Sequence, residues 1–202
     1  MSHRAARRIL AVVSIAMLLG GCGAGGRFRR DARALDSPSA DARRESALQL
    51  GTARVPDDST RRQLVRKLSV MAQSDPEALV RSASLTALAM QDPEAAVDLA
   101  RRVRTDTDPM VRWDAVRVMR TRGGRSTVGE LVEMTKDSDE NVRREAVKSL
   151  GPYDDPAVVA ALIDRITDKD ISVAHAARES LMQISGGVDL GMSADAWRKW
   201  LQ

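Results

Sequence analysis

A nine-residue motif recurs with a spacing of 31 residues along the chain. In every copy the fifth residue is small and the ninth is leucine or methionine. A fixed period of this length is typical of stacked supersecondary units, each of which buries its apolar face only against its neighbours. The copies are VRSASLTAL from Val80, VRWDAVRVM from Val111, VRREAVKSL from Val142 and VAHAARESL from Val173, with an earlier copy, ARRESALQL, beginning 38 residues before the first of these at Ala42.

The apolar spacing within each unit indicates two helices. Val111, Ala115 and Val118 follow the i, i+4, i+7 spacing of one helix face, and Val159 and Leu162 belong to a second helix after a short break. Aspartate caps the first amides of a helix, and proline at the next position has no amide to leave unpaired. The Asp-Pro starts are Asp75-Pro76, Asp92-Pro93, Asp108-Pro109 and Asp155-Pro156, and glycines that favour helix ends are Gly51, Gly123-Gly124, Gly151 and Gly186-Gly187. We predict an all-α protein.

Paired helices at this period, with the pattern D…VR..A…L in the first helix, resemble the short HEAT repeats named after phycobilisome lyases. The resemblance covers residues 40–186 and implies a right-handed α-α superhelix of about five helix pairs. The final segment, residues 187–202, resembles a tryptophan-bearing tail that closes some bacterial HEAT-repeat proteins. There we expect Ser193 to cap a last helix, with Trp197 and Trp200 on the face that covers the end of the stack.

Pairs of aspartates recur just before the first helix of successive units, as in TDTDPMVR and KDSDENVR. A catalytic pair has no reason to recur with the architecture. In the HEAT family an arginine of one repeat reaches a loop aspartate of its neighbour, and this resemblance implies a structural ladder, whereas the last repeat carries Ala174 in place of the arginine. Calcium binding is the alternative, but the segments lack the glycine and the later glutamate of an EF-hand loop. The ladder residues that we predict are Arg81, Asp108, Arg112, Asp139 and Arg143.

The sequence offers little for catalysis. After removal of an N-terminal signal, His175 is the only histidine, and no glycine-flanked serine elbow is present. HEAT-repeat iron hydroxylases of the deoxyhypusine class use His-Glu pairs, which this chain lacks. We therefore expect no catalytic residue, no metal and no cofactor.

A solenoid also presents a continuous surface, and such surfaces commonly bind proteins. We expect the second helices to form its concave face and to present charged side chains opposite their apolar stripes. The candidate binding residues are Arg62, Arg66, Asp98, Arg101, Arg102, Glu130, Glu133, Asp164 and Arg165.

The N-terminus has the pattern of an export signal. Arginines precede an apolar run of 11 residues, Ile9–Leu19, which has the length of a signal-peptide core. The tetrapeptide LGGC that ends at Cys22 resembles the lipobox of bacterial lipoproteins, in which the cysteine thiol receives a diacylglyceryl group after export. Residues 1–21 are then a lipoprotein signal peptide; a simple signal peptide with an incidental cysteine is the alternative.

Loss of the three arginines in residues 1–21 leaves 29 basic against 28 acidic residues, which removes most of the electrostatic support for nucleic-acid binding. Residues 22–39 contain glycines, serines and Pro38, and we predict a lipidated cysteine followed by a flexible tether. Its arginines lie within reach of an anionic membrane. They are Arg27, Arg29, Arg30 and Arg33.

Together these features predict a non-catalytic, lipid-anchored scaffold or adaptor that binds a protein at the bacterial cell envelope, on the cell membrane or the outer membrane. One alternative is an accessory subunit of an envelope or lyase-type enzyme. Another is a peptidoglycan or small-ligand binding module that uses Trp113, Trp197 and Trp200.

Overall fold

The computed structural model describes residues 24–201, which form eleven α-helices and, in that range, no strand. The all-α prediction is confirmed. A short π-helical turn, η1 (Met119–Gly123), and a 3-10 turn, η2 (Gly124–Thr127), separate α6 from α7. The helices are α1 (Ala24–Ala34), α2 (Ala40–Thr52), α3 (Asp58–Ser74), α4 (Ala78–Gln91), α5 (Pro93–Val103), α6 (Pro109–Val118), α7 (Val128–Met134), α8 (Glu140–Leu150), α9 (Pro156–Arg165), α10 (Ile171–Ile184) and α11 (Ala194–Leu201).

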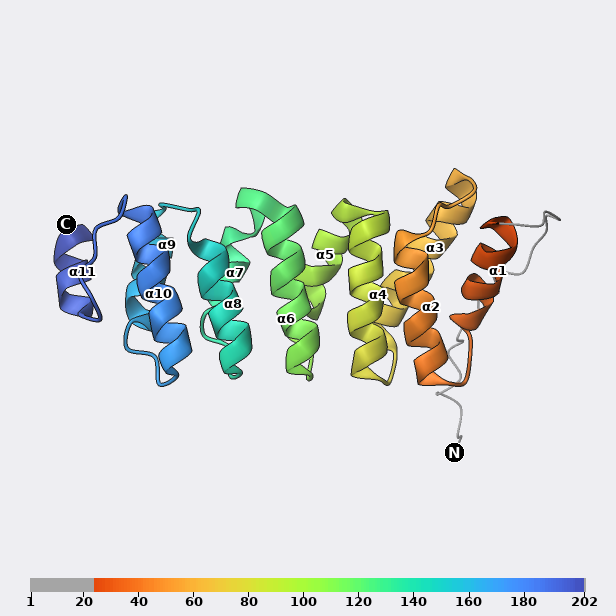
Figure 1. Cartoon of the computed structure of the whole chain (residues 1–202), viewed down its shortest axis with the longest axis horizontal. Coiled ribbons are helices and arrows are strands. Elements are labelled where there is room, and N and C mark those ends of the chain that lie inside the picture. Colours follow the sequence, from red (N-terminus) through yellow and green to blue (C-terminus); the bar gives the residue numbers. More distant parts are fainter. Residues whose placement is uncertain (1–23, 202) are drawn as a thin grey trace, which may run out of the picture.

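Ten of these helices form five pairs that stack side by side into a two-layered solenoid (Figure 1). One layer, here called the first-helix layer, consists of α2, α4, α6, α8 and α10. The other, the second-helix layer, consists of α3, α5, α7, α9 and α11. Each helix packs against its own partner or against its counterpart in the next pair, so the sequence period becomes the repeat of the structure.

The core lies between the two layers and is built from the periodic positions of the motif. Val111 and Ala115 of α6 have no exposed surface, and neither does Met119 directly after the helix. The small fifth residue of each copy is buried in all five units, which lets neighbouring helices approach closely. These residues are Ser46, Ser84, Ala115, Ala146 and Ala177.

The Asp-Pro signals mark three of the four helix starts that we predicted. Asp92 and Asp108 accept hydrogen bonds from amides in the first turns of α5 and α6, and Asp155 precedes α9 without a side-chain cap bond. Asp75-Pro76 was interpreted wrongly. Helix α4 begins at Ala78, and Asp75 follows the last residue of α3, where its side chain takes part in a contact between repeats.

Two glycines that we interpreted as helix ends have different roles. Gly186, two residues after the end of α10, has φ of +72°, a conformation that glycine adopts without steric cost, so it terminates that helix as predicted. Gly51 lies inside α2 instead. A Cβ atom there would lie 3.0 Å from the Cα of Ala87, so this glycine allows α2 and α4 to pack backbone against backbone.

The flexible tether predicted over residues 22–39 is not what the structure shows from residue 24 onward. Helix α1 docks on α2, with Phe28 and Ala32 buried. Ser46 of α2 donates a hydrogen bond to the carbonyl of Asp31 and helps to hold α1 in place. The prediction was wrong because it rested on the glycines alone. Phe28, Ala32 and Leu35 follow helical spacing and are all buried. Cys22 and the predicted signal peptide lie outside the described residues.

At the other end, α11 takes the place of the second helix of the last unit and packs against α9. Trp197 is fully buried, and its indole N–H donates to the carbonyl of Gly191 over 3.0 Å. Ser193 accepts a hydrogen bond from the amide of Ala196, so the predicted cap is confirmed. Trp200 stacks edge-on against Trp197 and stays partly exposed.

Candidate functional site

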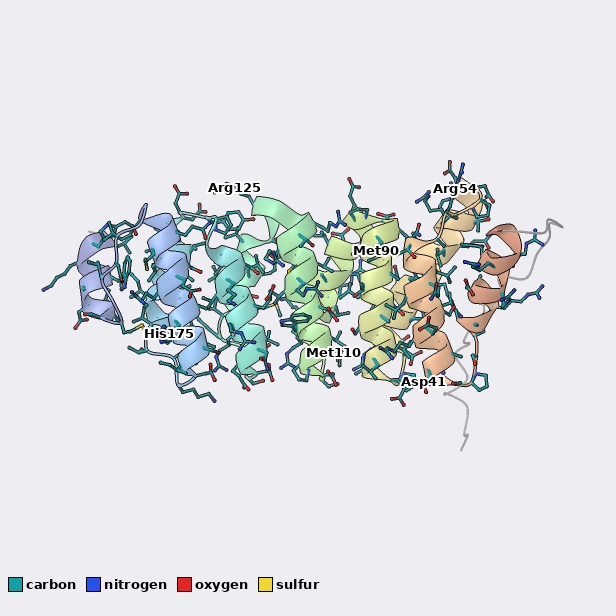
Figure 2. All side chains as sticks on the ribbon, viewed as in Figure 1. Asp41, Arg54, Met90, Met110, Arg125 and His175 are labelled. Atoms are coloured by element: carbon teal, nitrogen blue, oxygen red, sulfur yellow. The ribbon has the colours of Figure 1, made fainter. Side chains whose placement is uncertain are left out.

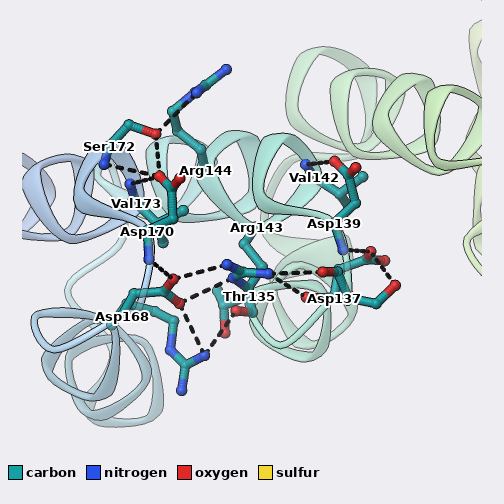
Figure 3. A network of polar contacts seen from close by, with 12 residues as sticks. Thr135, Asp137, Asp139, Val142, Arg143, Arg144, Asp168, Asp170, Ser172 and Val173 are labelled. Atoms are coloured by element: carbon teal, nitrogen blue, oxygen red, sulfur yellow. Dashed lines mark hydrogen bonds and ion pairs between the residues drawn. The ribbon is translucent and has the colours of Figure 1, made fainter.

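The arginines that follow the repeated valines form a ladder between repeats. Arg143 donates from Nε and Nη2 to the two carboxylate oxygens of Asp168 over 3.0 and 2.9 Å, and its Nη1 donates to the carbonyls of Asp137 and Ser138 (Figure 3). The same fork recurs in the other repeats, with contacts of 2.7–2.9 Å. The four rungs are Arg43–Asp75, Arg81–Asp106, Arg112–Asp137 and Arg143–Asp168.

The arginines of the predicted ladder are correct, but its aspartates are not. Asp108 and Asp139 do not bind Arg81 and Arg112, the arginines of the preceding repeats. Each caps its own helix instead, Asp139 by accepting from the amides of Asn141 and Val142. The partners are the aspartates two residues earlier. The second aspartate of each pair directly precedes the helix, so its carboxylate reaches the amides of the first helical turn. It therefore caps the helix, and the first aspartate is left to bind the arginine.

Each aspartate pair therefore works as one unit. The carboxylate of Asp168 also accepts the amide N–H of Asp170, so the first aspartate holds the second in its capping position. Asp106 and Asp137 do the same for Asp108 and Asp139.

Burial and charge act against each other at the ladder carboxylates. Burial raises the pKa of Asp168, but hydrogen bonds from Arg143 and from the Asp170 amide outweigh it and hold that pKa below its usual value. The pKa values of Asp106 and Asp137 are lowered by the same balance. The aspartates are thus ionised, and N–H donors occupy their oxygens. A calcium ion would have to displace these donors, which favours a structural role for the pairs.

In the part of the chain that the structure describes, no three histidine, cysteine, aspartate or glutamate side chains converge as metal ligands would. His175 lies exposed on α10, on the surface of the first-helix layer (Figure 2). Among the described helices, none is both long enough and apolar enough to cross a membrane.

Several residues of the predicted binding face connect repeats instead of remaining free. Arg101 donates to Glu130 and to the carbonyl of Ser126, each over 2.8 Å, and so bridges α5 to the next unit. Arg165 contacts Asp168 and the carbonyl of Thr135, both at 3.4 Å.

Some of the outer charged residues on this face form ion pairs, and others do not. Glu133 is 3.6 Å from Arg104, Asp164 is 4.0 Å from Arg198, and Asp98 pairs with Arg101 on the same helix. The exposed members without an ion pair to any described carboxylate are Arg62, Arg66 and Arg102.

The sequence interpretation missed a surface on the first-helix layer. Met110, Trp113 and Arg144 line a shallow groove of about 390 Å³ between α6 and α8, together with Pro109, Asp139 and Asn141. Met110 is 39% exposed and Trp113 is partly buried. Arg144 donates hydrogen bonds to Ser172 and Asn141, and neither of these two partners carries a negative charge. The available signal was the tryptophan itself, which occupies an outward position of the motif where the neighbouring copies carry Ser82 and Arg144.

A buried carboxylate lies beside this groove. Asp114 is 6% exposed, accepts a hydrogen bond from Ser82 over 2.5 Å and lies 3.5 Å from Arg117. Burial raises the pKa of Asp114 above its usual value despite these contacts. The guanidinium of Arg117 lies 4.7 Å from the centre of the Trp113 ring, so Arg117 links the carboxylate to the groove.

The three tryptophans do not form one ligand platform. Trp113 projects from α6, in the middle of the solenoid, whereas Trp197 and Trp200 belong to α11 at its end (Figure 1). Trp197 has no exposed surface to offer a ligand. The small-ligand alternative based on these three residues is therefore not supported.

The repeated units are those of a known family: residues 32–120 and 99–182 match HEAT repeats. The chain belongs to the HEAT-repeat family. No curated protein matches it.

Two solved structures resemble this HEAT-repeat chain in fold. YibA from Escherichia coli has a TM-score of 0.69 at 19% identity, over 78% of this chain and 59% of YibA. The match thus spans less than two thirds of the YibA chain. An engineered protein has a TM-score of 0.53 at 19% identity, over 79% of each chain. At this identity the likeness extends to the solenoid fold alone.

Proposed function

We propose that this HEAT-repeat protein is a non-catalytic lipoprotein that acts as an interaction scaffold at the bacterial cell envelope and holds a protein partner near a membrane. The observation that carries the proposal is the ladder. The ladder arginines and aspartates are bonded to one another, so the recurring charged motif is architecture. What is left for function is the exposed surface of the solenoid, and surfaces of this kind commonly bind proteins.

The groove at Trp113 is the stronger candidate for the partner-binding surface. Tryptophan, methionine and arginine are the residue types enriched in protein interfaces, and tryptophan and arginine dominate their binding energy. Met110, Trp113 and Arg144 combine them in one place. On the second-helix layer, by contrast, Arg101 and Arg165 already bind other parts of the chain.

Membrane attachment is supported by the sequence LGGC, which places a cysteine directly after the apolar run of an export signal. To test it, the full chain and a Cys22→Ser variant are expressed in a bacterium and fractionated, and the N-terminus is analysed by mass spectrometry. We expect a lipid-modified N-terminal cysteine on the membrane-bound protein and an unprocessed or mislocalised variant. A wild-type chain without lipid at Cys22 would contradict attachment.

The partner is tested by affinity capture from detergent-solubilised membranes with three variants of the full chain. We expect Trp113→Ala to lose a stoichiometric protein that the wild type retains. Trp200→Ala is the matched control, since it removes another surface-exposed tryptophan from a different helix. If Arg66→Ala loses the partner and Trp113→Ala retains it, the binding surface is the second-helix layer.

A further inference from the structure

Helix α1 has two faces of opposite character. Its apolar face, with Phe28 and Ala32, is buried against α2. Arg27, Arg30 and Arg33 are exposed and follow one another at i, i+3 spacing, so they lie along one side of the helix. No carboxylate of residues 24–201 forms an ion pair with them, whereas every ladder arginine has such a partner.

The position of α1 makes this charged side unusual. It is the first helix of the described stack and packs mainly on α2, so its outer side is the end surface of the solenoid (Figure 1). The chain continues from Ala24 towards Cys22, two residues earlier. Two residues of backbone span at most about 7 Å. A lipid on Cys22 would therefore bring the start of α1 to the headgroup layer.

We propose that the outer side of α1 binds anionic phospholipid headgroups and mounts the solenoid end-on, with the repeats projecting away from the membrane. This inference rests on the proposed lipid anchor for its geometry. Guanidinium groups bind phosphate oxygens through paired hydrogen bonds, which suits three arginines aligned on a rigid helix. The lipid supplies attachment, and the arginines determine orientation.

Charge argues against the other occupants of this surface. A second copy of the chain packed symmetrically on α1 would place arginines against arginines. The only carboxylate of α1 is that of Asp31, which is half-buried beside Arg27 and Gln49. The end surface thus carries an excess of positive charge that an anionic membrane neutralises.

The test uses residues 23–202 without lipid, a segment that contains every hydrophobic core residue that the structure describes, from Phe28 to Trp197. Flotation is measured with vesicles of phosphatidylcholine alone and of phosphatidylcholine mixed with phosphatidylglycerol. We expect binding only to the anionic vesicles. The triple variant Arg27→Gln/Arg30→Gln/Arg33→Gln should bind about a hundredfold more weakly, since each basic residue near an anionic surface contributes roughly a fivefold gain.

The matched control is Arg62→Gln/Arg66→Gln/Arg102→Gln, which removes the same charge from exposed sites on the second-helix layer. It should bind like the wild type. Equal losses in both triple variants, or equal binding to neutral vesicles, would overturn the proposal. Dimerisation of the wild type that the α1 variant abolishes would assign the surface to a second copy instead.

Orientation is measured by energy transfer from a single label to acceptors in the membrane, with the lipidated full chain in anionic vesicles. Arg54→Cys places the label near α1 (Figure 2). Lys199→Cys places it on α11, at the far end of the solenoid (Figure 1). We expect strong transfer from position 54 and weak transfer from position 199. Equal transfer from both would show that the solenoid lies flat. Loss of lipid from Cys22 would refute the anchor without affecting flotation of the unlipidated chain, so the two proposals fail separately.

Discussion

Arg143 connects two interrepeat loops through a single guanidinium group. Its fork binds the carboxylate of Asp168 in the following loop, and its remaining nitrogen binds the carbonyls of Asp137 and Ser138 in the preceding loop. Both side chains of this rung are only 4% exposed, which makes it the most buried of the four. The ladder thus fixes the spacing of adjacent units at the same place in each repeat.

Replacing Arg143 with alanine should destabilise the solenoid strongly, because Asp168 would remain buried and would keep only the longer contact of 3.4 Å with Arg165. We expect the free energy of unfolding to fall by about 3–5 kcal/mol. Arg143→Lys should recover only part of this, since lysine keeps the charge but not the fork. Urea unfolding followed by circular dichroism measures both.

The control for the ladder is Arg66→Ala, an exposed second-helix arginine that should change stability by less than about 0.5 kcal/mol. Arg101 lies on the same layer, but its bonds to Glu130 and Ser126 predict a larger loss of stability for Arg101→Ala than for Arg66→Ala. Unfolding of Arg143→Ala at the wild-type urea concentration would show that the ladder is not structural.

The lowered pKa values of Asp106, Asp137 and Asp168 predict acid sensitivity. A carboxyl group with a lowered pKa in the folded state contributes stability above its unfolded value of about 3.9, and this stability is lost as the pH falls through the folded value. Asp189, whose pKa the hydrogen bonds from Arg178 lower to about 2, extends this window downward. We expect melting temperatures to drop below about pH 4 and Asp168→Asn to flatten the drop. An equal slope in that variant would contradict the assignment.

Asp114 should show the opposite pH dependence. Because burial raises its pKa, the folded state favours the protonated form, and stability is lost as the pH rises from the unfolded value through the folded value. Asp114→Asn keeps an acceptor for Ser82 but has no charge. We expect this variant to be more stable than the wild type at pH 7 and the difference to vanish below about pH 4, as measured by urea unfolding at both pH values.

The C-terminal helix should depend on Trp197 far more than on Trp200. Trp197 has no exposed surface, and its replacement by alanine should cost about 3–5 kcal/mol in the cooperative unit that contains α11. Trp200 is 39% exposed, and the same substitution there should cost much less. Hydrogen exchange of the α9 and α11 amides locates the effect. Similar losses for both variants would mean that the two rings act as one cluster.

The solenoid was predictable because its information is local and repeated. The period of 31 residues, the buried small fifth residue and the arginine after the valine recur in sequence, so the helix pairs and the arginines of the ladder could be assigned without coordinates. The helix caps at Asp92 and Asp108 could be predicted equally well, because a capping side chain binds amides only two or three residues away.

Other features depend on contacts between residues that are far apart in sequence. The sequence alone could not choose between Asp137 and Asp139 as partner of Arg112, because both lie in the same loop and only the stacking of α6 on α8 decides which carboxylate the guanidinium reaches. Likewise, the glycine-rich segment forms helix α1 because Phe28 packs against the apolar surface of α2.

Arg101 was misjudged for the same reason. On its own helix it faces outward, and only the position of the next unit brings Glu130 within 2.8 Å. Helical periodicity fixes which side of a helix a residue occupies, whereas the packing distance between neighbouring helices decides whether that side faces water or another charge.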